Sequence, residues 1–399
     1  MTMKYTRNRN HNRFSARLYI FFGTNRCHGR LRGYMNNYNQ MIHQSVNPVD
    51  TVSTFRNLWH LVGNTPMLRL DYRYNGCPDC IYVKCEHYNL TGSVKDRMAL
   101  HILQEAYSEG RIKPGDTIVE ATSGNTGIAF AALGRALGHP VTIVMPDWLS
   151  RERVDIIRSL GATVRLVTKE DGGFLGSLAL CDELAIQGDV FLPQQFENGD
   201  NAGAHELTTM PEIWMQLAQL GIKPDAFVAG VGTGGTVMGA CRYFKRLDPS
   251  FNVHPLEPAE SPTLSSGYKV GTHRIQGISD EFIPAIVQLD ELDAVIQAND
   301  GDAILMAQQL ARVLGLAVGI SSGANVVGAI KLKRTLGPEA TVVTLLCDSN
   351  KKYLSTDLVR NEPVGENYIT PAVDWIGFQP IQRLDHQATE IAQTTLNID

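Results

Sequence analysis

The chain has 399 residues, of which 43% are apolar, and it carries a formal net charge of −5. No apolar run approaches the roughly 20 residues that a membrane-spanning helix needs, so we expect a globular protein with a large core and no membrane partner. Residues 1–49 hold eight Lys and Arg and no Asp or Glu, which leaves 28 basic and 41 acidic residues in the remainder. An acidic body without a basic stripe argues against nucleic acid as a partner.

Residues 1–50 differ from the rest of the chain because they are basic and rich in Asn. Two interpretations stay open. The segment is either a disordered, processed or mis-assigned extension, since Met35 and Met41 offer later starts, or it is an organellar transit peptide. We expect a cytoplasmic protein in the first case and an organellar one in the second.

From residue 57 onward, short Val- and Ile-rich runs alternate with amphipathic runs of helical length. The predicted strands are 116–121, 141–146, 162–167, 190–196, 225–232 and 341–348, and the predicted helices are 127–137, 150–161, 177–187, 235–247, 301–315 and 322–334. This alternation predicts an α/β fold whose mostly parallel sheets are covered by helices. The alternation is lost after residue 360, so we expect residues 361–399 to be a tail that packs on the body or on a second subunit.

The run "GVGTGGT" (230–236) joins a predicted strand to a predicted helix. Glycines there let the backbone approach an anion closely, and the N–H groups at the start of the following helix favour negative charge. The run lacks the Lys-Ser/Thr ending of a nucleotide P-loop. It predicts a phosphate cradle, with a plain tight turn as the alternative.

The run "TSGNTG" (122–127) crowds small hydrogen-bond donors at another predicted helix start. The donors suit a carboxylate, whereas an ordinary N-cap would account for Ser123 or Thr126 but not for the whole cluster.

In the third junction, "GSVKDR" (92–97), Lys95 stands at the start of a predicted helix. Partial burial beside the positive end of a helix would lower the pKa of this lysine, and a free amine can form a Schiff base. The alternative is a solvated surface lysine. Taken together, a phosphate cradle, a carboxylate loop and such a lysine indicate pyridoxal phosphate with an amino-acid substrate.

The motifs "LVGNTPMLRL", "GSVKDR", "EATSGNTG", "QQF", "GVGTGGT", "GISSGA" and "KKYLST" occur in this order over residues 57–358. Through them the chain resembles the cysteine synthase and cystathionine β-synthase family, which are fold type II pyridoxal-phosphate enzymes related to the tryptophan synthase β subunit. The resemblance implies two lobes, each a mostly parallel twisted sheet covered by helices. Residues 51–95 and 200–360 would form the large cofactor-binding lobe, and residues 96–199 the small mobile lobe.

The resemblance also implies roles for individual residues. Lys95 would hold the cofactor as a Schiff base and later act as the base at the substrate α-carbon. Asn125 would bind the cofactor's ring oxygen, and Ser322 would face its pyridine nitrogen. The phosphate would rest on Gly232, Thr233, Gly234, Gly235 and Thr236, and the substrate carboxylate on Thr122, Ser123, Thr126 and Gln195.

The implied reaction is a β-replacement on an activated serine, such as O-acetylserine, through an aminoacrylate intermediate, with sulfide as nucleophile and L-cysteine as product. Alternatives within the family are a cystathionine β-synthase and a synthase of the diaminopropionate type that adds an amine. A regulatory binding protein without turnover is an alternative of another class. The resemblance further implies a homodimer and raises serine acetyltransferase as a partner.

Some residues depart from the family pattern. Ala121 stands where proline is frequent, and Asn350 and Lys351 stand where cysteine synthases usually have Gly-Glu, which puts the preference for sulfide in doubt. Asp280 and Glu281 replace small residues; they would either line the site entrance, where they repel anions or receive an ammonium group, or form a solvated acidic turn.

The seven cysteines do not predict a disulfide framework, because their number is odd and several lie in apolar runs. Cys77, Cys80, Cys85 and His87 fit no usual zinc spacing, so we predict no metal site.

Overall fold

A computed structural model describes residues 51–186, 188–278 and 282–385. The predictions for residues 1–50, for Asp280 and Glu281 and for the end of the tail beyond residue 385 therefore lie outside the described residues.

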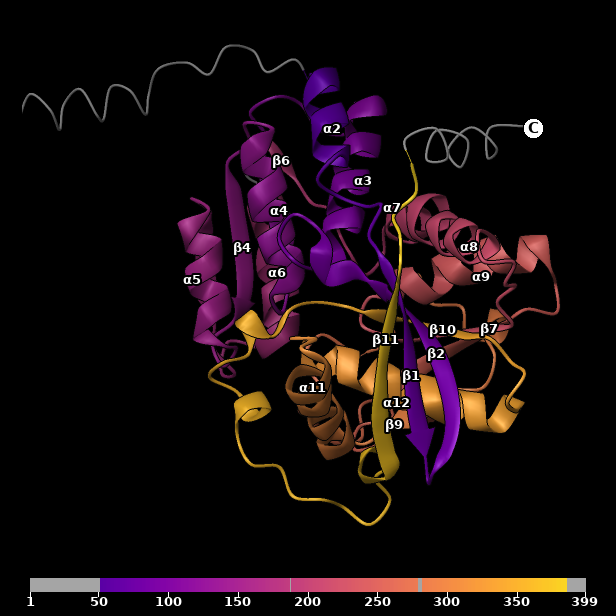
Figure 1. Ribbon diagram of the computed structural model, residues 1–399. Coiled ribbons are helices and arrows are strands. Elements are labelled where there is room, and N and C mark those ends of the chain that lie inside the picture. Colours follow the sequence, from indigo (N-terminus) through magenta and orange to yellow (C-terminus); the bar gives the residue numbers. More distant parts are fainter. Residues whose placement is uncertain (1–50, 187, 279–281, 386–399) are drawn as a thin grey trace, which may run out of the picture. The chain divides into compact units, whose positions relative to one another are not determined.

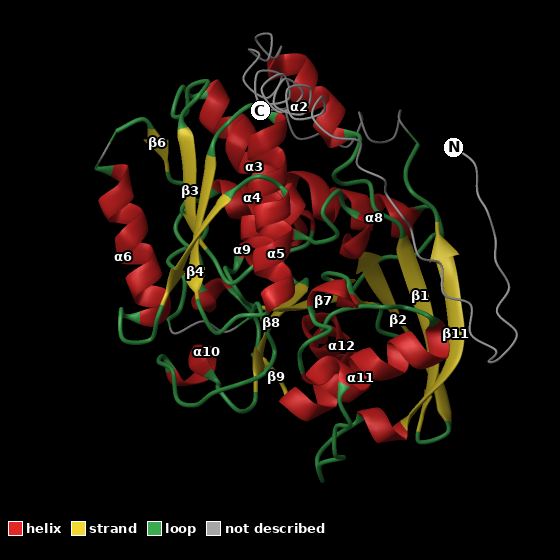
Figure 2. Ribbon diagram, turned by 90° about the vertical axis from the view of Figure 1, so that its left-hand side faces the viewer, coloured by secondary structure: helices red, strands yellow, loops and turns green. Residues whose placement is uncertain are grey.

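A four-stranded parallel sheet has the strand order β5-β4-β3-β6. Its strands are β3 (Thr117–Ala121), β4 (Val141–Pro146), β5 (Thr163–Val167) and the short β6 (Val190–Phe191). Helices α3 (Lys95–Ser108), α4 (Asn125–Ala136) and α5 (Arg151–Ser159) lie on one side of this sheet, and α6 (Gly173–Ala185) lies on the other (Figure 2). The two sides bury separate apolar clusters, with Ile118 in one and its neighbour Val119 in the other, as the twofold alternation of a strand requires.

A seven-stranded mixed sheet has the order β11-β1-β2-β10-β7-β8-β9. Its strands are β1 (Met67–Tyr74), β2 (Cys77–Cys85), β7 (Ala226–Gly230), β8 (Asn252–Pro258), β9 (Ile296–Ala298), β10 (Val342–Leu346) and β11 (Val373–Ile381). The strands from β2 to β9 in this order are parallel, whereas β1 runs antiparallel to both β2 and β11.

Helices cover both faces of the larger sheet. On one face α11 (Asp300–Leu314) and α12 (Ile320–Leu336) pack with Val342, and on the other α8 (Met210–Ala218) and α9 (Gly235–Leu247) pack with Val343. Figure 1 shows the two helix pairs on opposite sides of the strands. The remaining helices and helical turns are α2 (Thr51–Trp59), α7 (Asp200–Ala204), α10 (Thr263–Ser266), a π-helical turn (His205–Thr209) and 3-10 turns at Glu86–Tyr88, Leu289–Glu291, Asn350–Lys352, Asp357–Val359 and Thr370–Ala372.

The predicted fold class is confirmed: the chain is a mixed α/β protein with two mostly parallel sheets and helices on their faces. Two details differ from the sequence-based expectation. The strand predicted at 190–196 has only two residues, because the chain turns at Gln194, whose φ is 54°. Residues 373–381, predicted as part of a tail, form β11, which lies beside β1 in Figure 1.

Helix α2 packs into the core of the four-stranded sheet, where Phe55 meets Tyr107 of α3 edge-to-face at 5.6 Å between ring centroids. Within the described ranges, no helix has both the length and the apolar composition to cross a membrane.

Candidate active site

One cavity gathers most of the residues that the motifs predict to be functional. It is lined from α3, from the β3–α4 junction, from the segment after β6, from the β7–α9 junction and from the segment after β10. The predicted residues that line it are Lys95, Thr122, Ser123, Asn125, Thr126, Gln195, Gly232, Thr233 and Thr236. These junctions follow the carboxyl ends of parallel strands, where open α/β sheets bind their ligands.

Lys95 is the first residue of α3 and is half-buried. The segment before it is fixed to the end of β10, because the N–H of Val94 donates to the carbonyl of Cys347 at 2.9 Å. Gly92 has φ +80°, the left-handed conformation that lets the chain turn into the helix. The side chain of Asp96 accepts hydrogen bonds from the backbone and hydroxyl of Thr91, which closes this turn, and burial raises the pKa of Asp96 to about 6.

A buried ion-pair cluster anchors α3 from within. Arg97 pairs with Glu86 at 2.6 Å and with Glu212 at 2.7 Å, and Lys84 pairs with Glu212 at 2.8 Å. Burial alone would raise the pKa of Glu212, but the charges of Arg97 and Lys84 outweigh it and lower the pKa to about 2. The cluster therefore holds α3, the helix that carries Lys95, in place, and each of its buried charges has a partner of opposite sign.

The loop at 122–127 is braced by Gln195. The hydroxyl of Thr126 donates to Oε1 of Gln195 at 2.6 Å, and Nε2 of Gln195 donates to the carbonyl of Ala121 at 2.7 Å. Thr122 accepts a hydrogen bond from the N–H of Gly124, so the loop holds its donors in a fixed arrangement. Such an arrangement at the start of α4 is suited to a carboxylate.

The glycines of the loop at 232–236 stand where there is no room for a side chain. A Cβ on Gly232 would overlap the carbonyl of Gly277, and a Cβ on Gly235 would overlap Oδ1 of Asn201. Gly234 has φ +88° at the N-cap of α9. Asn201 also donates to the hydroxyl of Thr233 at 2.9 Å, and both Thr233 and Thr236 line the cavity at the start of this 13-residue helix.

His205, which the motifs do not predict, stands behind Thr236. Its Nε2 lies 3.4 Å from the hydroxyl of Thr236, and its Nδ1 lies 2.9 Å from that of Thr209. Burial, with the nearby charges of Lys95 and Arg97, lowers the pKa of His205 to about 3. The ring is therefore neutral, and it occurs in the π-helical turn, a feature frequent at functional sites.

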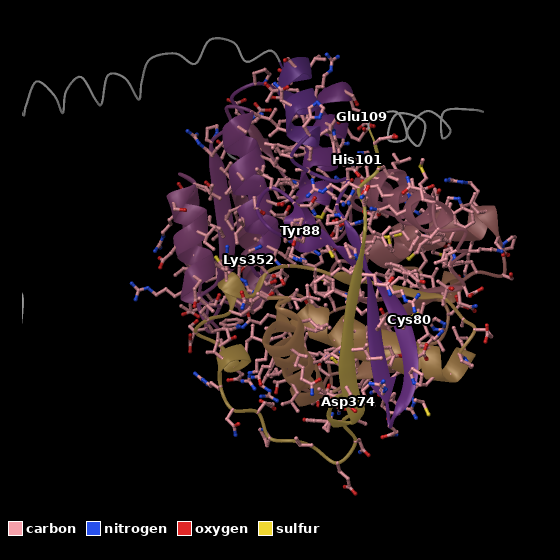
Figure 3. The ribbon with its side chains drawn as sticks, viewed as in Figure 1. Cys80, Tyr88, His101, Glu109, Lys352 and Asp374 are labelled. Atoms are coloured by element: carbon pink, nitrogen blue, oxygen red, sulfur yellow. The ribbon has the colours of Figure 1, made fainter. Side chains whose placement is uncertain are left out.

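Asn125 is held at both ends of its amide. Its Nδ2 donates to Oδ2 of Asp348 at 2.8 Å, and its Oδ1 accepts from Nζ of Lys352 at 2.8 Å. Asp348 also accepts from the hydroxyl of Tyr353 at 2.7 Å. Lys352, labelled in Figure 3, is buried, and burial lowers its pKa. The sequence indicated Asn125, but not the two residues that orient it.

Arg153 of α5 also lines the cavity and was not predicted. It is 2% exposed, its guanidinium lies 4.7 Å from the ring centre of Tyr353, and it donates to the side-chain oxygen of Gln276. No carboxylate of the described ranges forms an ion pair with it. A Cβ on Gly124 would overlap the Arg153 side chain, so this cation lies directly over the 122–127 loop.

The two serines of "GISSGA" point to different places. Ser321 lines the cavity, whereas Ser322 is not among the lining residues. The hydroxyl of Ser322 instead accepts a hydrogen bond from the N–H of Cys347 at 2.8 Å. The predicted role of Ser322 therefore stays a prediction, and Ser321 is the neighbour that reaches the cavity.

The charge of the lining points to anionic ligands. Among the described residues that line it, Lys95 and Arg153 are basic and none is acidic. Two helices, α4 and α9, begin at its edge, and both direct positive helix ends toward it. The cavity thus suits a ligand that carries a phosphate and another that carries a carboxylate.

Comparison with known proteins agrees with this chemistry. Residues 58–348 match the family described as pyridoxal-phosphate dependent enzyme. The chain belongs to this family. It is similar to the probable cysteine synthase of Bacillus subtilis, with 42% identity over 299 residues, 75% of this chain and 96% of the relative.

Two solved structures extend the comparison. A hydrogen sulfide-producing enzyme from Fusobacterium nucleatum is 52% identical with a TM-score of 0.81 and covers 83% of this chain and 99% of its own. An O-acetylserine dependent cystathionine β-synthase from Helicobacter pylori is 36% identical with a TM-score of 0.70. The match covers 76% of this chain and 98% of that protein. The protein is therefore a pyridoxal-phosphate-dependent enzyme of the cysteine synthase type.

The residues present fit this cofactor. The glycine loop suits a phosphate, because its backbone packs so closely on Gly277 and Asn201 that only glycine fits at positions 232 and 235. Lys95 and Asn125 lie in the same cavity as Gly232. The cavity measures about 50 Å³, so the cofactor's ring requires it to widen. For metal ions, the described residues contain no cluster of three or more His, Cys, Asp or Glu that could hold one.

Proposed function

We propose that the enzyme catalyses β-replacement on an activated serine such as O-acetylserine, and that sulfide is the nucleophile and L-cysteine the product. The observation that carries the proposal is a cavity lined both by Lys95 and by residues of two loops, 122–127 and 232–236, whose composition suits anions. The 42% identity to a cysteine synthase supports the same choice of reaction.

Each residue would have a defined task. Bound pyridoxal phosphate supplies an electron sink for negative charge that develops at the α-carbon. Lys95 would hold the cofactor and, once released, take the α-proton with its free amine. Asn125 would bind the ring oxygen through the second hydrogen of its Nδ2, since the first is bound to Asp348.

The phosphate would rest on the glycine loop, the hydroxyls of Thr233 and Thr236 and the N-terminus of α9. Ser321 would lie beside the pyridine nitrogen, and its position in the lining of the cavity supports this role. A serine hydroxyl there is neutral, which favours elimination at the β-carbon over transamination.

The substrate carboxylate would lie on the 122–127 loop, where Thr122 and Ser123 face the cavity and Gln195 braces Thr126. The guanidinium of Arg153 over this loop would add to the attraction. Acetate leaves the β-carbon and hydrosulfide bonds to it, so O-acetylserine and hydrogen sulfide become cysteine and acetic acid.

A second candidate is release of sulfide from cysteine. The observation that favours it is the 52% identity to a hydrogen sulfide-producing enzyme over nearly the whole of that protein. The same residues would act, but hydrosulfide would leave the β-carbon and water would bond to it in its place, so cysteine and water become serine and hydrogen sulfide. The acidic pair Asp280 and Glu281 stays a sequence-based reason to doubt an anionic nucleophile.

The test is product identification with the purified, cofactor-loaded protein. One reaction receives O-acetylserine and sulfide, a second O-acetylserine and homocysteine, and a third cysteine alone. We expect cysteine in the first reaction at a higher rate than cystathionine in the second or sulfide in the third. Faster sulfide release in the third would establish the second candidate, and no product in any of them would indicate a regulatory binding protein.

Homodimerisation and association with serine acetyltransferase stay proposals that rest on the family resemblance alone, and a cytoplasmic location stays a proposal that depends on how residues 1–50 are interpreted. Size-exclusion chromatography with light scattering tests the first of them directly, because a monomer in solution contradicts it.

A further inference from the structure

A second cavity lies on the far side of β3 from α4, between the strand and α6. Its volume is about 360 Å³, which is within the range of pockets that hold small organic ligands. Its walls are mainly apolar and include Leu175, Leu178, Leu192, Phe196, Phe282 and Ile283. A space of this size and polarity is too large to be explained by one or two structural waters.

Glu120 of β3 lines this cavity as a buried carboxyl group. The residue is 3% exposed, and its Oε2 has no hydrogen-bond partner among the described residues. No Lys, Arg or His of the described part forms an ion pair with it. Burial raises the pKa of Glu120 to about 8. A buried carboxyl oxygen without a partner is costly, so a ligand that donates a hydrogen bond to Oε2 would gain free energy.

The side chains at the mouth of the cavity are acidic, as Glu120 is. Asp182 of α6 and Glu197 after β6 are exposed and line the cavity, and none of its described lining residues is basic. The potential at the mouth therefore attracts cations and repels anions, unlike that of the cavity at Lys95.

We propose that this second cavity binds a small ammonium compound with an apolar body, whose charged group pairs with Glu120. The apolar walls would enclose the body, and Asp182 and Glu197 would guide the cation to the mouth. The proposal does not depend on which amino acid the enzyme converts.

The site is connected to the candidate active site by two routes. Phe196 lines both cavities and packs against Phe174 and Phe282, with ring centres 5.6 Å and 5.2 Å away. Glu120 directly precedes Ala121, whose carbonyl is bound by Gln195. A ligand beside Glu120 would therefore contact the framework of the 122–127 loop.

The experiment uses the cofactor-loaded protein and N,N-dimethyl-2-phenylethylamine, a tertiary amine that cannot condense with the cofactor's aldehyde. We expect saturable binding by calorimetry, without a change in the cofactor's absorbance. Glu120→Gln keeps the shape of the side chain but removes its charge, and it should weaken binding by about tenfold or more. The control Asp182→Asn should change the affinity by less than about threefold, because its charge is exposed.

A pH series gives an independent signature. Because the amine pairs with the ionised form of Glu120, affinity should rise by roughly tenfold or more between pH 6.5 and 8.5. The other titratable groups that line the cavity are Asp182, Glu197 and Cys181; burial raises the pKa of the Cys181 thiol to about 12, so it stays neutral over this range. The neutral analogue 2-phenylethanol should show no such rise.

Three results would overturn the proposal: no saturable binding at millimolar amine, equal affinity of wild type and Glu120→Gln, or displacement of the amine by O-acetylserine in simple competition. Should Glu120→Gln fail to fold, Leu178→Trp, which fills the cavity, takes its place. It should abolish binding while the cofactor's absorbance is kept, and undiminished binding would contradict the proposal.

Discussion

Lys352 donates a 2.8 Å hydrogen bond to the side-chain oxygen of Asn125, a residue 227 positions earlier in the chain. Together with Asp348 on the amide nitrogen, Lys352 determines which way the amide of Asn125 faces. In this orientation the nitrogen keeps a second N–H that is not donated to Asp348. That is the orientation needed to donate to the ring oxygen of the cofactor.

The variant Lys352→Met tests this orientation. It should lower kcat by about tenfold and shift the cofactor's absorbance band, because loss of a buried hydrogen bond costs about 1.4 kcal/mol and frees the amide to turn. Lys351→Met is the matched control, since Lys351 is exposed beside it. Equal effects of the two variants on the absorbance spectrum would contradict the role given to Lys352.

The adjacent serines give a second prediction. Ser321→Ala should change the absorbance and fluorescence of the bound cofactor with little loss of stability, because Ser321 faces the cavity. Ser322→Ala should lower the free energy of unfolding by about 1–3 kcal/mol, because it leaves the partly buried N–H of Cys347 without its acceptor. If Ser322→Ala changed the cofactor's spectra and Ser321→Ala lowered the stability instead, Ser322 would be the residue beside the pyridine nitrogen.

The cradle around the glycine loop gives a third prediction. Gly235→Ala should weaken cofactor binding by at least about tenfold, since its Cβ would displace Asn201 from the loop. Gly199→Ala is the control, because a Cβ there meets nothing within 4 Å. The dissociation constant is measured by fluorescence titration of cofactor-free protein, and an unchanged value for Gly235→Ala would exclude this loop as the phosphate site.

The ion-pair cluster beneath Lys95 predicts a pH dependence of stability. The pKa of Glu212 is lowered from its ordinary value of 4.5 to about 2, so its ion pairs stabilise the fold above pH 4.5. This contribution is lost as the pH falls from about 4.5 to 2. Glu212→Gln should therefore cost roughly 3 kcal/mol at pH 7, and the difference from wild type should shrink over that acidic range.

Urea unfolding of both proteins at several pH values measures this difference. The comparison removes the contributions of Asp96 and Glu120, whose raised pKa values are common to both proteins. A difference that stays constant from pH 7 to 3 would show that Glu212 is not ionised and paired in the folded state.

The sequence predicted the parts of the site that lie within single motifs. Lys95, Asn125 and the two loops could be placed because a strand, a turn and a helix start are local features, and parallel strands bring such junctions to one edge. Arg153, His205 and Lys352 could not be placed, since their roles arise from contacts with residues distant in the chain. Ser321 and Ser322 could not be told apart, because a helix directs adjacent side chains about 100° apart.

In the fold, too, local features could be predicted from the sequence, and features that depend on distant contacts could not. Runs such as "TVVTLL" read as buried parallel strands because both of their faces are covered. β11 was missed because it is an edge strand whose middle residues are mostly exposed, so its sequence lacks a continuous apolar run. Its place in the sheet depends on antiparallel pairing with β1, about 300 residues earlier.

The central claim is that the amine of Lys95 holds the cofactor, and borohydride reduction followed by peptide mass spectrometry tests it most directly. Reduction fixes the cofactor to the lysine that carries it. We predict the adduct on the peptide that contains Lys95, and none in a Lys95→Ala variant. An adduct on Lys352, a buried lysine that is hydrogen-bonded to Asn125, or no adduct in cofactor-loaded wild type, would contradict the account.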